Sequence, residues 1–255
     1  MRTTFAVFAV LTLLVYAPGQ AQRRSSRILI DASRDGGTWW SPVCSWCRGR
    51  HQGYNMVRYL RGKGAQVEEL AEGTVITDEL LTGRDVVIRA GSGHYSDISV
   101  RILGAEHPAG ELAAYRQYVE DGGKLLLLME YLRPGQRDSL AESFGLQFAG
   151  ISQGENRIDR FAAHAITRGV KSVSYNVGSG LVMPADHVTM LGFLSKGTYL
   201  DLNSDGRKNA GEPEGAGVLG ILEFGRGVVV FLGDVNTLQT LPQPLTDNLF
   251  KFLMK

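Results

Sequence analysis

The amino-acid sequence predicts an α/β protein: a flavodoxin-like parallel sheet flanked by helices and extended by a β-rich C-terminal half. Two observations support this prediction. Up to Gly150, short apolar runs alternate with segments of helical periodicity, which is the order expected of parallel strands joined by helices. Glycine makes up 32 of the 255 residues, well above its usual share of roughly 7%, and this excess indicates many tight turns between short elements.

The first half of the chain contains the strands and helices of the expected parallel sheet. Runs such as DVVIRA (85–90) and KLLLLM (124–129) are almost wholly apolar, as in strands covered on both faces. Leu112, Tyr115 and Val119 repeat at helical spacing before a pair of glycines that is typical of a helix end. In all, we expect strands at 27–33, 66–70, 85–90 and 124–129, and helices near 54–62, 112–121 and 139–144.

Beyond Gly150 the sequence changes to short β-like pieces separated by turns. We expect these pieces at 172–175, 188–194, 218–224 and 227–232, followed by a helix around 248–254. No repeat and no low-complexity linker divides the chain. The β-rich half is therefore expected to extend the same sheet, so that residues 22–255 form a single domain.

Residues 1–21 have the features of a cleaved signal peptide. Arg2 supplies a basic start, the segment from Phe5 to Tyr16 is apolar, and Gly19 and Ala21 place small residues before the expected cleavage point. The apolar run is shorter than the roughly 18 residues of a membrane span. We therefore expect a secreted or periplasmic protein with no membrane span.

The segment 201–212 matches the calcium-loop pattern D-x-[DN]-x-[DN]-G-x₅-E at every specified position. Such a loop holds Ca²⁺ through five side chains and the backbone carbonyl of its seventh residue. The expected ligands here are Asp201, Asn203, Asp205, Arg207 (through its carbonyl), Asn209 and Glu212. The flanking sequences are strand-like rather than the two helices of an EF-hand, so we expect a structural calcium site, with a solvated polar turn as the alternative.

Cys44 and Cys47 are the two cysteines of the chain, and their C-x-x-C spacing permits three roles. An oxidising compartment favours a local disulfide. A zinc half-site would need further ligands, for which His51 and His94 are available. A redox dithiol needs a helix that begins at the motif, whereas the next expected helix begins after His51. We prefer the disulfide, and the other two roles stay open.

Several strings along the chain resemble one known superfamily. They are RILIDAS, HQGYNMVRYLRGKGAQVEEL, DVVIRAG, ELAAYRQYVEDGGKLLLLME, HAITRGVKSVSYNVGSGL and GRGVVVFLGDVNTLQTLPQPLTDNLFKFL. These strings are similar to the class I glutamine amidotransferase-like superfamily, and within it to an exported, uncharacterised branch of gliding-motility and intraflagellar-transport (GIFT-like) type. The likeness covers nearly the whole chain after residue 21.

The resemblance also indicates what the chain lacks. Amidotransferases carry their reactive cysteine in a G-x-C-x-G elbow directly after a buried strand. The matching strand end here reads LLMEY (127–131), with the acidic Glu130 and no cysteine. Because an acyl-enzyme cannot form without the thiolate, we expect no glutaminase activity. The branch that the chain resembles is regarded as non-catalytic, with sugar binding suggested.

Polar residues that follow the expected strands are the candidates for a ligand site, because parallel sheets bind ligands outside the carboxyl ends of their strands. Two tryptophans in the first loop add flat faces that suit a sugar ring. The candidate ligand-binding residues are Asp31, Trp39, Trp40, His94, Glu130 and Asp234. Helix or loop capping is the alternative role for each polar residue, and a hydrophobic lid is the alternative for the tryptophans. His107 receives no role.

The sequence therefore supports three hypotheses. The first is an exported, non-catalytic, calcium-stabilised domain that binds a carbohydrate or another small ligand. The second is a hydrolase, with or without a metal, that uses Glu130 or Asp234 together with His94. The third is a structural module with a protein partner in the cell envelope. The 27 basic and 26 acidic residues nearly cancel, so we expect no nucleic-acid partner.

Overall fold

The computed structural model describes residues 24–34, 53–71, 73–90, 106–183, 186–238, 241 and 243–255. Several sequence predictions fall outside these described residues and stay predictions. They are the signal peptide at 1–21, the candidate ligand residues Trp39, Trp40 and His94, and the disulfide between Cys44 and Cys47.

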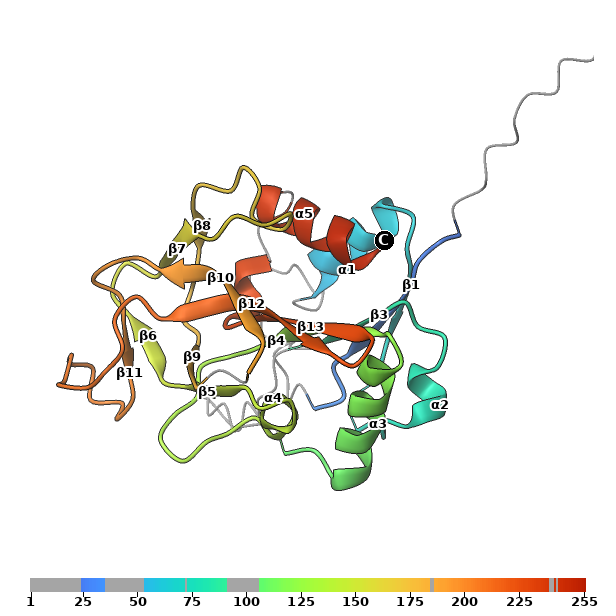
Figure 1. The fold of residues 1–255 in the computed structure, drawn as a ribbon, viewed down its shortest axis with the longest axis horizontal. Coiled ribbons are helices and arrows are strands. Elements are labelled where there is room, and N and C mark those ends of the chain that lie inside the picture. Colours follow the sequence, from blue (N-terminus) through green and yellow to red (C-terminus); the bar gives the residue numbers. More distant parts are fainter. Residues whose placement is uncertain are drawn as a thin grey trace, which may run out of the picture.

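A mixed sheet of nine strands, in the order β2-β1-β3-β4-β13-β12-β10-β7-β8, forms the centre of the molecule (Figure 1). Its strands are β1 (Arg27–Asp31), β2 (Gln66–Glu69), β3 (Val86–Arg89), β4 (Lys124–Leu128), β7 (Arg157–Phe161), β8 (Val173–Ser174), β10 (Val188–Leu194), β12 (Gly217–Phe224) and β13 (Gly227–Leu232). Two small antiparallel sheets accompany it: β5 (Gln147–Ala149) with β9 (Gly180–Met183), and β6 (Ile151–Gln153) with β11 (Tyr199–Asp201).

The strands from β2 to β13 form a parallel core, and those beyond β13 pair antiparallel. The parallel strands are apolar because both of their faces are covered; the leucines from Leu125 to Leu128 are fully buried. The last strand of the chain, β13, lies beside β4 and connects the parallel core to the antiparallel strands. These pairings confirm the predicted α/β sheet with its β-rich extension.

Helices cover both faces of the parallel strands. They are α1 (Tyr54–Gly62), α2 (Asp78–Leu81), α3 (Ala109–Glu120), α4 (Ser139–Ser143) and α5 (Pro244–Leu253), with a 3₁₀ turn η1 (Val235–Leu238). On one face, called here the α3 face, Leu29 packs with residues of α2, α3 and α4. On the other, the α5 face, Ile28 and Ile30 pack with residues of α1 and α5. Alternate side chains of one strand thus enter different cores.

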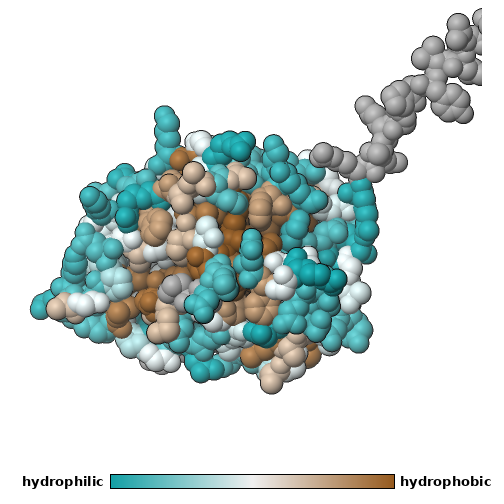
Figure 2. Space-filling view, in the orientation of Figure 1, coloured by the Kyte–Doolittle hydropathy of each residue, from teal (hydrophilic) through white to brown (hydrophobic). Residues whose placement is uncertain are grey.

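Some of the apolar surface over the antiparallel strands remains open to solvent. Figure 2 shows hydrophobic residues gathered in the middle of the face seen in Figure 1, bordered by hydrophilic ones. On β9, Val182 is 40% and Met183 58% exposed. Helices cover the parallel strands more completely (Figure 1). No helix formed by the described residues is long and apolar enough to cross a bilayer.

Candidate functional site

Buried polar side chains stand at the carboxyl ends of the parallel strands. Asp31 is the last residue of β1, Arg89 the last of β3, and Glu130 and Asp234 follow β4 and β13 by two residues. All four are at most 5% exposed. Buried charges are rare in proteins unless they are paired, so this edge of the sheet is chemically unusual.

The alternation of side chains divides this edge into two clusters. Asp31 and Arg89 share their register with Leu29 and Val87, whose side chains enter the α3 face. Asp234 has the register of Val230 and Leu232, which enter the α5 face. The edge therefore carries one polar cluster on each face of the sheet rather than one cleft with all the predicted carboxylates.

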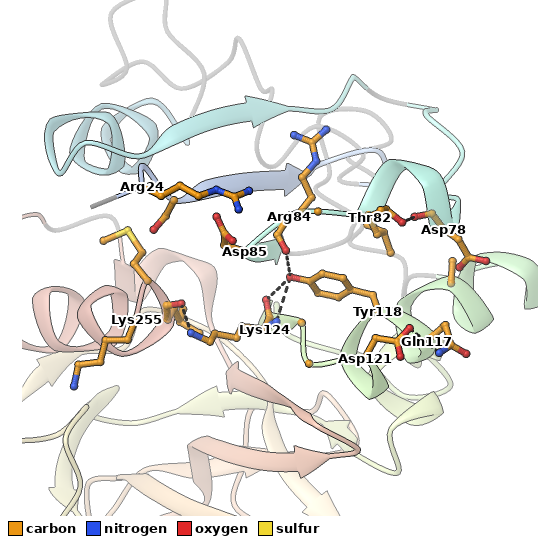
Figure 3. A pocket seen from close by; sticks show the side chains of 18 residues that line it. Arg24, Asp78, Thr82, Arg84, Asp85, Gln117, Tyr118, Asp121, Lys124 and Lys255 are labelled. Carbon is orange, nitrogen blue, oxygen red and sulfur yellow. Dashed lines mark hydrogen bonds between the residues drawn. The ribbon is translucent and has the colours of Figure 1, made fainter. Parts of the chain in front are cut away.

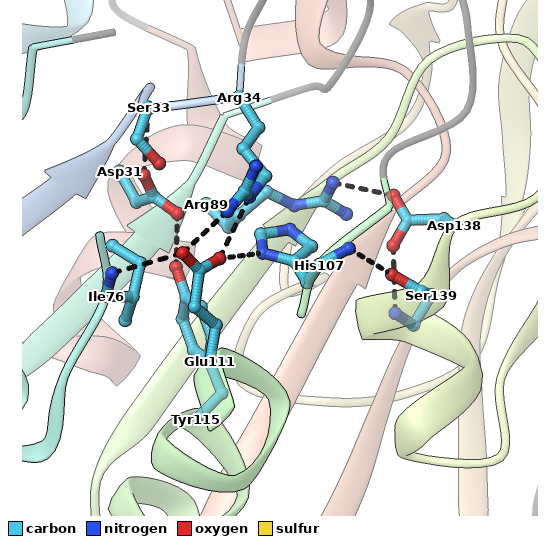
Figure 4. A network of polar contacts seen from close by, with 11 residues as sticks. Asp31, Ser33, Arg34, Ile76, Arg89, His107, Glu111, Tyr115, Asp138 and Ser139 are labelled. Carbon is cyan, nitrogen blue, oxygen red and sulfur yellow. Dashed lines mark hydrogen bonds and ion pairs between the residues drawn. The ribbon is translucent and has the colours of Figure 1, made fainter. Parts of the chain in front are cut away.

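The larger cluster lies on the α3 face, and we call it the α3 network (Figure 4). Its side chains come from strand ends, from the start of α3 and from the start of α4. They are Asp31, Ser33, Arg34, Arg89, His107, Glu111, Tyr115, Asp138 and Ser139.

Glu111, in the first turn of α3, is the centre of the network. Its carboxylate accepts two hydrogen bonds from Arg34, at 2.9 Å from Nε and 2.6 Å from Nη2. It also lies 3.0 Å from Nδ1 of His107 and accepts a longer bond from the backbone N–H of Ile76. Burial raises the pKa of Glu111, but the bonds from Arg34 and His107 outweigh burial, so the pKa lies below its usual value. Glu111 is therefore ionised at neutral pH.

The Glu111 carboxylate fixes the tautomer of His107, and burial fixes its charge. Burial, and then the charge of Arg89, lower the pKa of His107, so the ring is neutral at pH 7. An ionised carboxylate only accepts hydrogen bonds, so the proton of the neutral ring resides on Nδ1 and Nε2 keeps its lone pair. Among the described residues Nε2 is buried without a hydrogen-bond partner. Leaving such an atom unsatisfied costs about 1–3 kcal/mol.

Asp31 forms the second part of the network, together with Tyr115 and Ser33. The hydroxyl of Tyr115 donates to Oδ2 of Asp31, and the backbone N–H of Ser33 donates to Oδ1 at 2.8 Å. Burial, followed by the charge of Asp31, raises the pKa of Tyr115 well above its usual value, so the hydroxyl keeps its proton. The Ser33 hydroxyl, also buried, has no hydrogen-bond partner within the described part of the chain.

Arg89 and Asp138 form a buried ion pair beside His107. Nη1 of Arg89 lies 2.6 Å from Oδ2 of Asp138, and the two side chains are 1% and 3% exposed. The other oxygen of Asp138 accepts from the backbone N–H of Ala141 at 2.9 Å and caps α4. Each guanidinium of the network thus faces a carboxylate of the network.

The smaller cluster, on the α5 face, is centred on Asp234. Its carboxylate accepts from the backbone N–H groups of Asn176 at 2.8 Å and Asn236 at 2.9 Å, and from the Thr237 hydroxyl at 3.3 Å. Burial nevertheless raises the pKa of Asp234 to about 6. Burial also raises the pKa of Tyr175, with contributions from the charges of Asp234 and Glu130, so both carboxylates lie near that ring. The bonds tie the start of η1 to the β8–β9 connection, which is a structural role.

The strand end that the family resemblance assigns to the amidotransferase nucleophile does not form an elbow. Such an elbow is a sharp turn from a strand directly into a helix. Here β4 ends at Leu128 and α4 begins only at Ser139. Glu130, at the expected position, is 5% exposed, near Tyr175 on the α5 face.

Three of the sequence-predicted ligand residues can therefore be placed. Asp31 belongs to the α3 network, whereas Glu130 and Asp234 lie on the opposite face. The sequence prediction missed the rest of the α3 network, above all His107 and Glu111. His107 lies just before α3 and Glu111 in its first turn, four residues apart. This spacing in the sequence could have predicted their contact, because residues four apart meet on one side of a helical turn.

The predicted calcium loop joins β11 to the β12 region without flanking helices, as expected. Asp201 is 1% exposed, and its two oxygens accept from the backbone N–H groups of Ser204 at 2.6 Å and Gly206 at 2.8 Å. Glu212 closes the loop by accepting from Leu202 at 2.9 Å and Asn209 at 2.8 Å. Gly206 adopts a φ of 73°, the left-handed conformation that the sharp turn requires.

The loop supplies the oxygen donors that calcium prefers, but its carboxylates are not gathered closely. Desolvation, and then the charges of Asp201, Glu212 and Asp205, raise the pKa of Tyr199, so all three carboxylates lie within electrostatic reach of the Tyr199 hydroxyl. Within the described ranges, however, no three His, Cys, Asp or Glu side chains are gathered closely enough to hold a metal ion. The donor chemistry fits Ca²⁺, whereas binding would require the oxygens to move together.

Two grooves lie at the other end of the strands. One, of about 680 Å³, is lined by Arg84, Asp85, Tyr118 and Lys124, among others (Figure 3). The Tyr118 hydroxyl lies 3.4 Å from the carbonyl of Arg84 and 3.3 Å from that of Lys124, which ties the starts of β3 and β4 together. A neighbouring groove of about 1010 Å³ runs along α1 and α5. Tyr118 and Lys124 bond backbone carbonyls here, and the buried polar atoms without a partner in the described part of the chain include those of the α3 network, which makes that network the better candidate site.

No protein-family model matches the chain, and no curated protein matches it. Solved structures do. The mmIFT52 N-terminal domain matches with a TM-score of 0.60 at 17% identity, over 89% of this chain and 97% of that one. A ThuA-like protein from Bacteroides uniformis matches with a TM-score of 0.58 at 13% identity, over 93% and 95% of the two chains.

A third structure, described as a GMP synthase subunit from Thermoplasma acidophilum, links the fold to amidotransferases. It matches with a TM-score of 0.53 at 12% identity, over 90% of this chain and 92% of that one. Identities this low define a fold and leave activity undetermined. The protein has an amidotransferase-like α/β fold, as the resemblance of its strings indicated.

Proposed function

We propose that this protein is an exported, non-catalytic member of the amidotransferase-like fold that binds a small polar ligand, and specifically a carbohydrate, in the α3 network. One observation carries the proposal. His107 Nε2 and Ser33 Oγ are both buried at the carboxyl edge of the sheet, and neither has a partner among the described residues. Buried polar atoms are nearly always hydrogen-bonded, and ligand hydroxyls would satisfy both.

The position of the network supports a ligand site. Ligands of open α/β sheets bind outside the carboxyl ends of the strands, and the network occupies this place at β1 and β3. Trp39 and Trp40 follow β1 in the sequence, so we propose that they supply the apolar faces on which sugar rings stack. We also propose that the chain belongs to the GIFT-like branch and is secreted or periplasmic.

The lack of turnover is proposed from the β4 end. The acidic Glu130 replaces the expected thiol there, and α4 begins too far along the chain to display a nucleophile on an elbow. A carboxylate in that place can neither form the thioester nor release ammonia from glutamine. Incubation of the processed protein with L-glutamine should therefore release no ammonia above a buffer control, and release would refute the proposal.

We further propose that the 201–212 loop binds Ca²⁺ as a structural ion. Its oxygen donors are those of a calcium loop, and its carboxylates concentrate negative charge near Tyr199. Binding of Ca²⁺ would neutralise this charge and draw the oxygen donors together. Extracellular calcium modules bind with a Kd of about 10⁻⁴–10⁻³ M, which suits an exported protein.

A glycan array tests the carbohydrate proposal. We expect the wild-type protein to bind a subset of glycans and His107→Asn to lose that binding. Asparagine retains an N–H that can donate to Glu111 but has no atom at the position of Nε2. His164→Asn is the matched control, because His164 lies elsewhere and its Nδ1 accepts from the backbone of Ile166. Equal loss in both variants, or binding by neither wild type nor control, would contradict the proposal.

A hydrolase is the second candidate function, and one observation favours it. A carboxylate that orients a neutral histidine and leaves Nε2 free is the arrangement of a general base. His107 and Glu111 thus replace the pairing of Glu130 or Asp234 with His94 as the better-supported base. Turnover of ester or glycoside substrates by wild type, abolished in His107→Asn and retained in His164→Asn, would select this function.

A further inference from the structure

We infer that the ligand of the α3 network is uncharged and offers a hydroxyl proton to His107, so that acidic ligands such as uronic acids are excluded. This inference rests on the proposed function and specifies its ligand class. It follows from the charge balance of the network and from the protonation state of His107.

The positive charges of the network are already matched by its own carboxylates. Arg34 makes two parallel hydrogen bonds to Glu111, a geometry that occupies one side of its guanidinium. Arg89 lies 2.6 Å from Asp138. An acidic ligand would have to displace one of these carboxylates to reach a guanidinium.

Asp31 leaves the network with an excess of negative charge. Its partners are the Tyr115 hydroxyl and a backbone N–H, and neither carries a formal charge. His107 adds no charge, because burial and the nearby Arg89 keep its ring neutral. The positive end of α3 faces Glu111 in the first turn. A second anion brought into this buried place would meet repulsion that water screens poorly.

The protonation state of His107 selects a hydrogen-bond donor. The ionised Glu111 carboxylate accepts a hydrogen bond from Nδ1–H of the neutral ring, which leaves Nε2 as an acceptor only. A carboxylate or phosphate oxygen has no proton to donate and would be repelled by the Nε2 lone pair, whereas a sugar hydroxyl would donate a hydrogen bond to it. The hydroxyl of Ser33, two residues after the end of β1, is also buried in this network. It can donate or accept a hydrogen bond and so suits a second ligand hydroxyl.

Matched sugars provide the experiment. Neutral oligosaccharides (glucose, galactose and mannose disaccharides) and the same sugars oxidised to uronic acids are titrated by calorimetry into wild type, Asp31→Asn and His164→Asn. We expect wild type and the His164→Asn control to bind a neutral sugar at least about tenfold more tightly than its uronic acid. Asp31→Asn, which keeps an acceptor for Tyr115 and removes the excess charge, should reduce that preference.

The outcomes separate this inference from the proposed function. Tighter binding of the uronic acids by wild type would overturn the inference and leave carbohydrate binding intact. Absence of binding by every sugar would overturn both. The protonation state is tested without a variant by ¹⁵N NMR of histidine-labelled wild type: a proton on Nδ1 of His107 supports the inference, and a proton on Nε2 overturns it even if Asp31→Asn does not fold.

Discussion

Replacing Asp234 with asparagine tests whether burial controls the charge of the Asp234 cluster. The folded protein holds this carboxyl at a pKa of about 6, against an ordinary value of 3.8. Well below pH 3.8 the carboxyl is protonated in the folded and unfolded chains alike. As the pH rises towards 6, the unfolded chain ionises freely while the folded protein resists ionisation, so stability falls.

The size of this effect follows from the two pKa values. One pKa unit corresponds to 1.36 kcal/mol, so full ionisation of Asp234 removes about 3 kcal/mol of stability, of which about 2.5 kcal/mol is lost between pH 4 and pH 7. The sign is opposite to that of Asp205 and Asp247, whose pKa values lie below the ordinary one and which stabilise the fold as the pH rises. Comparison with Asp234→Asn isolates the single group.

Urea unfolding from pH 4 to pH 7.5 provides the assay. Asparagine loses one of the acceptors that bond Asn176, Asn236 and Thr237, which adds a pH-independent cost of about 1–3 kcal/mol. The difference in stability, wild type minus Asp234→Asn, should therefore decrease by about 2.5 kcal/mol from pH 4 to pH 7. A difference that stays constant over this range would show that Asp234 does not ionise with a raised pKa in the folded protein.

Three further predictions concern the ion pair, the loop and the sheet. Arg89→Met leaves the Asp138 carboxylate buried without its ion-pair partner, so urea unfolding should show a loss of about 3–5 kcal/mol, part of it recovered when Asp138→Asn is added. Calcium at 10 mM should stabilise wild type by about 2.7 kcal/mol for a Kd of about 10⁻⁴ M and raise Tm by several degrees. Asp205→Asn should reduce that shift, and an equal Tm in chelator would count against the site. Tyr118→Phe should cost about 1–2 kcal/mol in urea unfolding, because its hydroxyl bonds the backbone at the starts of β3 and β4; an unchanged midpoint would contradict this.

The elements that the sequence predicted well are those with a strong local pattern. The runs at 188–194 and 227–232 coincide with β10 and β13. β13 is mostly buried, and a strand covered on both faces needs an apolar residue at nearly every position. The prediction missed β7, which has five residues, and several elements with too few residues to show a period. α2 spans four residues and depends on the Thr77 side chain, which accepts from the N–H of Leu80, while β5, β6 and β11 each span three residues and are fixed by their partners.

The candidate site was predictable in place but not in composition. A polar residue at the end of an apolar run indicated the carboxyl edge, and Asp31 lies there. The face on which each carboxylate lies depends on the strand register and on the turn after it, so the separation of Asp31 from Asp234 required the structure. Arg89 ends a strand whose four residues are all buried, and its ion-pair partner Asp138 is far away along the chain. No local pattern in the sequence therefore indicated this pair.

The most direct test of the central claim, that the α3 network binds the ligand, is a ¹⁵N NMR titration of the histidine side chains. The chain has 5 histidines, and selective labelling allows each ring to be followed. On addition of a glycan that the protein binds, we expect the Nε2 resonance of His107 to shift, while those of His164 and His187 stay unchanged. A bound glycan that leaves the His107 resonance unchanged would show that the ligand binds elsewhere.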